Sequence, residues 1–260
     1  KTFYGKRSGH VPYAGELSCD LVIDALAKVL GLTHEAVPKD YADRALASLF
    51  ASPARELTFC AGCPHRASFL ALHNALALAG RDGFVCGDVG CYTMGVLPAG
   101  FGVLKTAFCM GSGIGLASGF GRLERFGFDQ RVVAVCGDST FFHAAMPALV
   151  DAVHHKSDVM LVVLDNSGTA MTGFQPHPGI EEDASGAPAE VVDIESVCRA
   201  VGAEVVVGDP FEVEATEEML VSLLERQGPR VAILRQSCAL SPHKRSEPRY
   251  RMTVRQDVCI

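Results

Sequence analysis

The sequence lacks any apolar run that approaches the roughly 18 residues of a membrane-spanning helix. Its first ten residues also lack the layout of a secretory signal peptide. Basic residues are scarce, because 23 Lys and Arg stand against 30 Asp and Glu, giving a formal net charge of −7. No basic stripe offsets this excess, so a nucleic-acid partner is not expected. Together these absences predict a cytoplasmic protein that binds neither membrane nor nucleic acid.

An initiator methionine and internal repeats are missing as well. The chain begins at Lys1 and not at a methionine, so we expect a fragment of a longer chain. The sequence predicts three parts: a linker with a helical lead-in (1–55), a main domain (56–240) and a tail (241–260). The last residues, VRQDVCI, resemble the start of a bacterial ferredoxin module whose first ligand would be Cys259. The CxxCxxC continuation is missing, which favours truncation.

The chain of 260 residues is 48% hydrophobic, which is enough for one large α/β domain. Short, continuous apolar runs alternate with segments of helical spacing, as in a buried parallel sheet. The predicted strands are 83–86, 106–110, 132–136, 159–164, 203–207 and 231–236. The predicted helices are 19–30, 41–50, 66–79, 111–123, a segment after Ser139, 193–201 and 211–227. The pattern predicts an α/β fold with one doubly wound, mainly parallel sheet of about six strands.

Two polar clusters organise the stretch from 132 to 173. Gly137-Asp138-Ser139 follows one predicted strand, and Asp165-Asn166-Ser167-Gly168 follows the next. Parallel strands bring both clusters to the carboxyl edge of the sheet, where such folds bind ligands. A carboxylate and an amide there provide the oxygen ligands of a hard divalent cation. A helix cap followed by an ordinary turn is the alternative interpretation.

Ten cysteines are many for a domain of this size, and without an export signal they favour metal or redox chemistry over disulfides. Cys60 and Cys63 form a CxxC before Pro64, at the start of a predicted helix. Such a pair fits a zinc site, a redox dithiol or iron–sulfur ligands. A structural zinc site would need further ligands nearby, and a second CxxC is absent. Cys91 and Cys238 each follow a predicted strand, at the edge that carries the polar clusters.

The other cysteines of the main domain are expected to be buried small hydrophobes; they are Cys86, Cys109, Cys136 and Cys198. Residues 175–192 contain several Pro, Gly and acidic residues and are expected to form a mobile loop. The GxGxG at 111–115 is a weak indication of a dinucleotide site. His65 and His143 are candidates to line the site as acid–base groups, and Arg66 and His177 are further candidates for acid–base or substrate contacts. His154 and His155 end a helix and are expected at the surface.

Five motifs occur in order along the chain: CAGCPHRASF, GDVGCYTMG, CMGSGIGLASGFG, GDSTFFH and LDNSGTAMTGFQPHPG. They resemble the thiamine-binding region of the large (α) subunits of indolepyruvate:ferredoxin oxidoreductases. The likeness covers roughly residues 56–240 and indicates the 2-oxoacid:ferredoxin oxidoreductase superfamily. The thiamine motif of such proteins reads Gly-Asp-Gly, followed about 25–30 residues later by Asn-Asn. Here Ser139 replaces the second Gly, and Asp165 replaces the first Asn. Neither change removes a proposed ligand.

The resemblance implies three cofactors: thiamine diphosphate, Mg²⁺ and a [4Fe–4S] cluster. Mg²⁺ would be held by Asp138, Asn166 and the carbonyl of Gly168. The cluster would be held by Cys60, Cys63, Cys91 and Cys238. Further residues expected to contact the cofactor are Asp88, Gly111, Gly137, Ser139, Thr169 and Thr172.

The resemblance also implies an activity, namely oxidative decarboxylation of 2-oxoacids such as indolepyruvate to acyl-CoA. Coenzyme A and ferredoxin would be the co-reactants. The glutamate that activates the aminopyrimidine ring has no match here, so a pyrimidine-side domain and a second subunit are expected in a hetero-oligomer. Two alternatives remain open: a non-oxidative thiamine-dependent 2-oxoacid decarboxylase, and a zinc-stabilised interaction module without catalytic activity.

Overall fold

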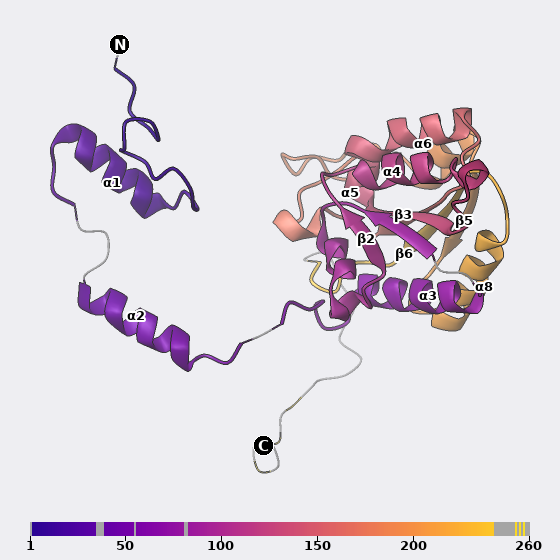
Figure 1. Cartoon of the computed structure of the whole chain (residues 1–260), viewed down its shortest axis with the longest axis horizontal. Coiled ribbons are helices and arrows are strands. Elements are labelled where there is room, and N and C mark those ends of the chain that lie inside the picture. Colours follow the sequence, from indigo (N-terminus) through magenta and orange to yellow (C-terminus); the bar gives the residue numbers. More distant parts are fainter. Residues whose placement is uncertain are drawn as a thin grey trace. The chain divides into compact units, whose positions relative to one another are not determined.

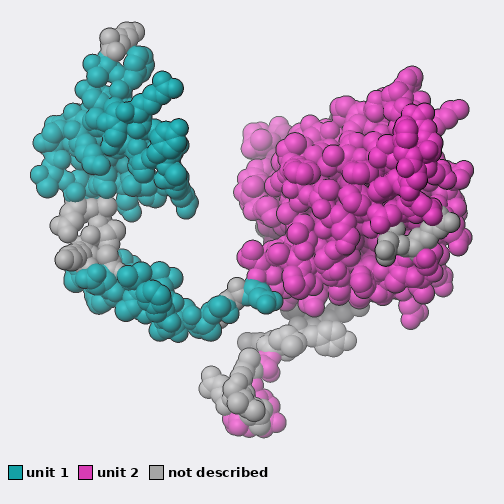
Figure 2. All heavy atoms as spheres, in the orientation of Figure 1, with its two compact units in different colours: residues 1–56 teal, residues 57–260 magenta. Residues whose placement is uncertain are grey.

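The computed structural model describes residues 2–34, 39–54, 56–80, 83–241, 253, 255 and 257. The chain divides into two compact units, residues 1–56 and residues 57–260 (Figure 2). No helix among the described residues is both long enough and apolar enough to cross a membrane. Cys259, the predicted first ligand of a ferredoxin module, lies outside the described residues.

The first unit consists of two helices, α1 (Cys19–Leu30) and α2 (Lys39–Ala51). The side chain of Ser18 caps α1 by accepting from the backbone N–H of Leu21. Gly31 ends the helix with a left-handed backbone (φ 65°), as its position after the apolar pattern predicts. Ala27 is the one buried residue among the described part of this unit. Its helices are therefore defined by local signals and not by a core of their own.

The second unit is built on a six-stranded sheet in which every pairing is parallel. The strand order is β2-β1-β3-β4-β6-β5. The strands are β1 (Gly83–Gly87), β2 (Leu104–Ala107), β3 (Arg131–Gly137), β4 (Met160–Asp165), β5 (Glu204–Gly208) and β6 (Arg230–Arg235). This confirms the predicted doubly wound α/β fold.

Helices cover both faces of the sheet (Figure 1). One face carries α4 (Ser112–Phe120), α6 (Met146–His154) and α7 (Ile194–Ala200), and the other carries α3 (Pro64–Leu78) and α8 (Val213–Leu224). Alternate residues of β3 serve the two faces: Val132 and Ala134 pack on the first, Val133 and Val135 on the second. A strand buried on both faces must be apolar throughout, which explains its continuous apolar run.

The remaining elements are short turns of helix. They are η1 (Cys91–Val96), η2 (Pro98–Gly100), η3 (Glu124–Phe126), α5 (Asp138–Thr140), the π-helical η4 (Phe141–Ala145) and η5 (Ala170–Thr172). The helix predicted after Ser139 is thus interrupted by a π turn. Such turns are rare in proteins, and many of those that do occur lie beside functional sites.

The strand order creates a crevice between β1 and β3. From β1 the chain moves outward to β2 and then returns past β1 to β3. At such a switch point the connections leave the sheet on opposite sides, and ligands bind beyond the carboxyl ends of the strands. Asp88 follows β1 and Asp138 follows β3, so two buried carboxylates flank this crevice.

The turn before α4 depends on glycine. Gly111 has a φ of 82°, and a Cβ there would lie 2.5 Å from the Cβ of Ala144. The observed β2 ends at Ala107, three residues before the predicted end at Met110, because the chain must form this turn.

Replacing Gly111 by alanine is expected to lower the free energy of unfolding by about 2 to 4 kcal/mol, through backbone strain and overpacking. Gly115 is the matched control, because it lies in the same helix with no atom near its missing Cβ. Alanine there is expected to stabilise the protein by about 0.5 to 1 kcal/mol. Urea denaturation measures both effects, and equal values for the two variants would contradict the structural explanation.

Candidate cofactor site at the carboxyl edge of the sheet

A cavity of about 110 Å³ lies between the turns that follow β1, β3 and β4. Its walls include most of the residues that the sequence predicts for the cofactor. They are His65, Cys91, Gly137, Asp138, Ser139, Asn166, Gly168, Thr169 and Thr172. Segments separated by more than 100 residues in the sequence therefore meet at one edge of the sheet.

Asp138 is the most constrained carboxylate of the cavity, with its side chain only 3% exposed. Its Oδ1 accepts from the backbone N–H of Ser139 at 2.7 Å. Its Oδ2 accepts from the N–H groups of Asn166 and Gly168, both at 3.1 Å. The β3 turn and the β4 turn are thus joined through one carboxylate, which satisfies a buried charge with backbone donors.

Three oxygen atoms converge beside this carboxylate. Oδ1 of Asn166 lies 3.2 Å from Oδ2 of Asp138 and 2.7 Å from the carbonyl oxygen of Gly168. Oxygen atoms that face only one another repel unless a cation lies between them. A carboxylate, an amide oxygen and a carbonyl are the donors that hard divalent cations take, so the residues present fit a Mg²⁺ ion.

The orientation of the Asn166 amide decides whether these oxygens meet. In the reverse orientation the amide nitrogen would donate to both oxygens. In the observed one, Nδ2 faces Nε2 of His65 at 3.3 Å. Burial lowers the pKa of His65 to about 4, against an opposing effect of Asp138. The ring is therefore neutral near pH 7, and its Nε2 can either accept from the amide nitrogen or donate to the amide oxygen. His65 thus fits both orientations, and a bound cation would select the one that brings the three oxygens together.

His65 reaches the cavity from the first turn of α3 and is 4% exposed. Pro64 stands at the first helical position, where its fixed φ suits the start of a helix. The edge of the His65 ring contacts Tyr92, with the centroids 6.4 Å apart. The CxxC turn thereby places the neutral imidazole of His65 beside the side-chain amide of Asn166.

A second buried network holds the turn after β1. Tyr92 donates its hydroxyl proton to Asp88 and lies 2.9 Å from the hydroxyl of Thr140. Gly111 donates its N–H to the other carboxylate oxygen of Asp88 at 3.1 Å. Burial raises the pKa of Asp88, partly offset by these hydrogen bonds, and burial also raises the pKa of Tyr92. Asp88 thus joins three loops and does not itself line the cavity.

Replacing Tyr92 by phenylalanine removes the hydroxyl that joins these turns. We expect the free energy of unfolding to fall by about 1.5 to 3 kcal/mol, the usual range for a hydrogen bond to a charged group. Tyr41, which is 57% exposed on α2, provides the matched control. Its phenylalanine variant should change stability by less than about 0.5 kcal/mol. Chemical denaturation would refute the assignment if both variants matched the wild type.

The four cysteines predicted as ligands gather near the same edge. Cys63 ends the CxxC turn, and its N–H donates to the carbonyl of Cys60 at 3.1 Å. An added Cβ at Gly62 would lie 3.9 Å from the Cβ of Ala239, so this turn lies beside the loop that carries Cys238.

The effects of neighbouring cysteines on the pKa values of Cys63 and Cys91 also indicate that these thiols lie near one another. Burial raises the pKa of Cys63, and the nearby Cys60 and Cys238 raise it further. Burial also raises the pKa of Cys91, followed by the effects of Cys63, Cys238 and Cys60. Cys63 and Cys91 therefore each lie within electrostatic range of the other three thiols. In the part of the chain that the structure describes, no three or more His, Cys, Asp or Glu side chains are arranged to hold a single metal ion.

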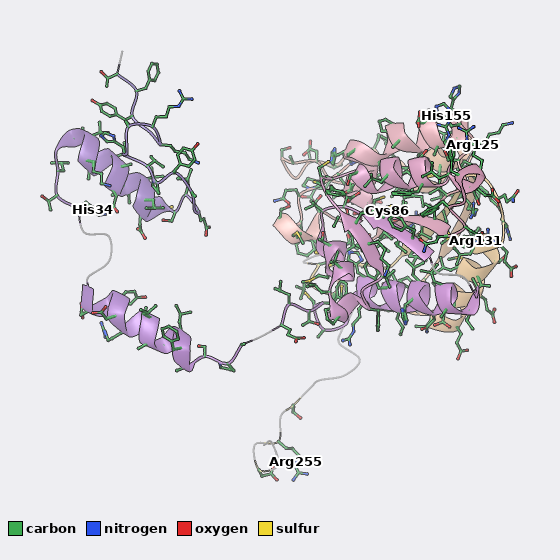
Figure 3. All side chains as sticks on the ribbon, viewed as in Figure 1. His34, Cys86, Arg125, Arg131, His155 and Arg255 are labelled. Carbon is green, nitrogen blue, oxygen red and sulfur yellow. The ribbon has the colours of Figure 1, made fainter. Side chains whose placement is uncertain are left out.

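Other residues predicted from the sequence lie elsewhere. His143 is exposed on η4 and is absent from the cavity wall. His155 pairs with Asp151 at 3.4 Å near the end of α6, away from the sheet (Figure 3). Cys86, Cys136 and Cys198 are buried as predicted, whereas Cys109 is exposed. The prediction for Cys109 was wrong because it lies in the turn after β2 and not within the strand.

The departure at Asp165 has a structural explanation. This residue, which stands in place of the motif's first Asn, bonds Nε of Arg235 at 2.7 Å. The two residues are register partners on β4 and β6. Burial raises the pKa of Asp165, and Arg235 opposes that effect. This side chain is therefore engaged with the neighbouring strand and leaves Asn166 as the cavity residue.

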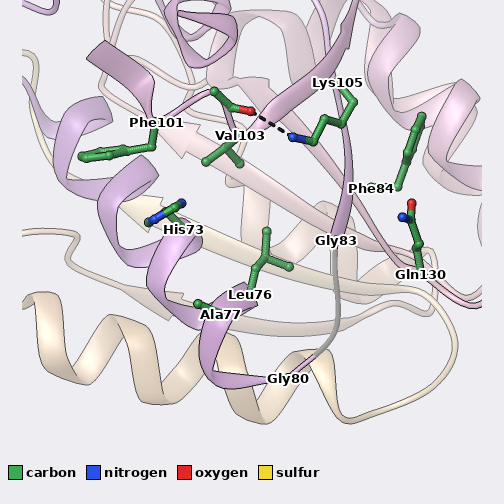
Figure 4. A pocket seen from close by; sticks show the side chains of 11 residues that line it. His73, Leu76, Ala77, Gly80, Gly83, Phe84, Phe101, Val103, Lys105 and Gln130 are labelled. Atoms are coloured by element: carbon green, nitrogen blue, oxygen red, sulfur yellow. Dashed lines mark hydrogen bonds between the residues drawn. The ribbon is translucent and has the colours of Figure 1, made fainter. Parts of the chain in front are cut away.

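A larger cavity, of about 680 Å³, lies at the opposite, amino-terminal side of β1 and β2. His73 stacks on Phe101 there, and Nζ of Lys105 donates to the carbonyl of Gly102 at 3.1 Å (Figure 4). It holds none of the converging oxygens or cysteines described above. Chemistry rather than size therefore identifies the smaller cavity as the candidate site.

Two residues of the cavity wall were missed from sequence. Tyr92 and Thr140 were not predicted, although each directly follows a predicted site segment, at Cys91 and at Ser139. His177, from the loop predicted to be mobile, is buried and lies 3.2 Å from Oδ2 of Asp138. His177 was a candidate from the sequence, but its contact with Asp138 was not predicted, because 39 residues separate the two in the sequence.

Comparison with known proteins gives several matches. The chain is similar to indolepyruvate oxidoreductase subunit IorA from three archaea. Identity is 37% over 243 residues with Methanothermobacter marburgensis, 36% over 238 with Archaeoglobus fulgidus and 37% over 241 with Pyrococcus horikoshii. These alignments cover 92%, 91% and 88% of the chain but only 37%, 37% and 36% of the relatives. The chain therefore spans a little over a third of their length.

A solved 2-oxoglutarate:ferredoxin oxidoreductase from Magnetococcus marinus shares the fold, with a TM-score of 0.58 at 16% identity. The match covers 72% of this chain and 66% of that one. The family described as "Thiamine pyrophosphate enzyme, C-terminal TPP binding domain" matches residues 88–233, which contain the turns after β1, β3 and β4. The chain therefore belongs to the thiamine pyrophosphate enzymes, through the C-terminal TPP binding domain that these residues form.

Proposed function

We propose that this chain is the thiamine diphosphate-binding part of a 2-oxoacid:ferredoxin oxidoreductase. One observation carries the proposal: Cys63 and Cys91 each lie within electrostatic range of the other three cysteines, near the edge that holds the converging oxygens. A thiamine site alone needs no cysteines. A thiamine site beside an electron-accepting cluster needs four, which makes an oxidative reaction the better explanation.

Mg²⁺ is proposed to bind Asp138, the amide oxygen of Asn166 and the carbonyl of Gly168, and to hold the diphosphate. The convergence of these three oxygens supports the assignment. When bound, thiamine diphosphate would supply the carbanion chemistry that decarboxylation of a 2-oxoacid needs. The chain's own residues supply the metal ligands and the walls of the cavity. His65 presents a neutral ring to the cavity and contacts the amide of Asn166.

A [4Fe–4S] cluster is proposed to be held by Cys60, Cys63, Cys91 and Cys238. Thiolates are the ligands such clusters take. Cys63 stands at the amino end of α3, where the helix dipole stabilises a thiolate. Gly137, Ser139, Thr169 and Thr172, which line the cavity, are proposed to surround the cofactor, and Asp88 and Gly111 are proposed to hold the turns beside it.

The substrate is proposed to be an arylpyruvate such as indolepyruvate, by similarity to proteins named indolepyruvate oxidoreductase subunit IorA. The reaction would convert the 2-oxoacid and coenzyme A into acyl-CoA and carbon dioxide. Two electrons would pass through the iron–sulfur cluster to ferredoxin. Because the chain spans little over a third of its relatives, a pyrimidine-side domain and a second subunit are proposed to complete a cytoplasmic hetero-oligomer.

Anaerobic purification of the assembled enzyme that contains this chain tests the proposal. The expected sample is brown, contains iron, sulfide, Mg²⁺ and thiamine diphosphate, and reduces ferredoxin with indolepyruvate and coenzyme A. Thiamine diphosphate without iron would instead favour a non-oxidative decarboxylase. Zinc without thiamine diphosphate would favour an interaction module and reject the proposed enzyme.

A further inference from the structure

One histidine of the loop between η5 and α7 is buried although most of that loop is exposed. His177 is 6% exposed, whereas Pro176 before it is half-buried and Gln175 and Pro178 are exposed. A histidine ring buried beneath a surface loop must have its polar atoms satisfied. The contacts of its two nitrogens therefore indicate why the ring is there.

The ring is held by two contacts that fix its position and its tautomer. It stacks on Phe142, with centroids 5.6 Å apart and planes inclined by 28°. Nδ1 accepts from the backbone N–H of Gly179 at 3.1 Å. An accepting Nδ1 carries no proton, so the proton of the neutral ring is on Nε2. A Cβ at Gly179 would lie 2.7 Å from the Phe142 ring, so this turn also needs glycine.

Nε2 faces the carboxylate of Asp138 at 3.2 Å from Oδ2, and the two side chains are 1% and 3% exposed. The approach angle falls outside hydrogen-bond geometry, and no other partner satisfies this nitrogen. A buried donor thus lies 3.2 Å from a buried acceptor without forming a hydrogen bond to it. Hydrogen bonds of this kind are often poorly aligned until a site is assembled.

We propose that His177 is a positioning residue that holds the Asp138 carboxylate for the metal. The inference rests on the proposed function, since Asp138 is the metal ligand proposed there. Nε2–H would donate to Oδ2 and restrain rotation of the carboxylate, adding a side-chain donor to the backbone N–H groups already bound. Partners of this kind around a ligand typically change metal affinity by about 10- to 100-fold. The loop after η5 is thereby anchored to the turn after β3 that carries Asp138.

Two variants separate the donor from the packing. His177→Phe keeps an aromatic ring against Phe142 but has no donor, and His177→Gln keeps a donor. Mn²⁺ serves as the probe, and its dissociation constant is measured by electron paramagnetic resonance on the assembled enzyme with thiamine diphosphate. We expect the Phe variant to bind Mn²⁺ about 10- to 100-fold more weakly and the Gln variant to recover most of the loss. Thermal unfolding checks that both are folded.

His155→Phe is the matched control, because His155 faces Asp151 in a histidine–carboxylate pair outside the cavity. It should bind Mn²⁺ like the wild type. If the Phe variant does not fold, His177→Met replaces it, since Met matches Gln in length but cannot donate. Wild-type affinity in the variant without a donor, or equal weakening with and without a donor, would overturn the role of His177. A wild-type enzyme that binds no Mn²⁺ would overturn the proposed metal site as well.

Discussion

Replacing Asp138 by alanine is expected to abolish retention of thiamine diphosphate and Mg²⁺ by the assembled enzyme. The carboxylate contributes the only charge among the three converging oxygens, and its loss also leaves the N–H groups of Asn166 and Gly168 without their acceptor. Loss of one partner from a buried charged pair costs about 3 to 5 kcal/mol, which corresponds to an affinity about 150- to 4000-fold weaker. Equilibrium dialysis of thiamine diphosphate at fixed Mg²⁺ measures the change.

Asp151→Ala provides the control for Asp138→Ala, because Asp151 lies on the exposed side of α6 and faces His155. It should retain cofactor like the wild type. Circular dichroism establishes that both variants keep the fold. Wild-type cofactor retention by folded Asp138→Ala would refute its role as a ligand.

Replacing Cys91 by alanine is expected to remove one iron–sulfur cluster from the enzyme. Cys91 lies in the wall of the cavity and within electrostatic range of the other three predicted ligands, so its loss leaves the cluster with three. We expect about four fewer iron atoms per assembled enzyme than in the wild type, with electron transfer to ferredoxin lost. Iron and sulfide analysis of anaerobically purified protein measures this directly.

Cys19→Ala is the control for cysteine loss, because Cys19 is exposed in α1 and belongs to the other unit. Its iron content should equal that of the wild type. A Cys91→Ala enzyme with unchanged iron would show that the thiols at this edge are not cluster ligands. The proposed thiamine site would then have no electron-accepting cluster held by these cysteines.

Much of the fold was predictable because buried parallel strands must be apolar throughout. The runs that became β3 and β4 are continuous, and each is followed by polar residues that cannot stay inside the sheet. The limits of β2 were less predictable, since Cys109 and Met110 are apolar enough to continue a strand. The turn at Gly111 packs closely against Ala144. The local pattern of residues does not reveal a contact between such distant parts of the chain.

The candidate site was predictable only where short motifs carry it. Asp138 and Asn166 are marked by strand ends, and the Cys60–Cys63 pair is marked by its spacing. His177 has no comparable mark, because a polar loop rich in proline and glycine is typical of an exposed segment. Its burial results from stacking on Phe142 and from its position against Asp138. Such contacts between distant segments exist only once the chain has folded.

The placement of β6 between β4 and β5 bears on how the nascent chain matures. Among the described strands, β5 pairs with β6 alone, so it leaves the ribosome before its partner has been synthesised. Pairings between distant segments form late and leave strand edges unprotected meanwhile. Cys238 follows β6 directly, and its N–H donates to the carbonyl of Asn166 at 3.1 Å. The strand β6 thus pairs with both β4 and β5 and brings Cys238 beside Asn166, so all of these contacts can form only after β6 has been synthesised.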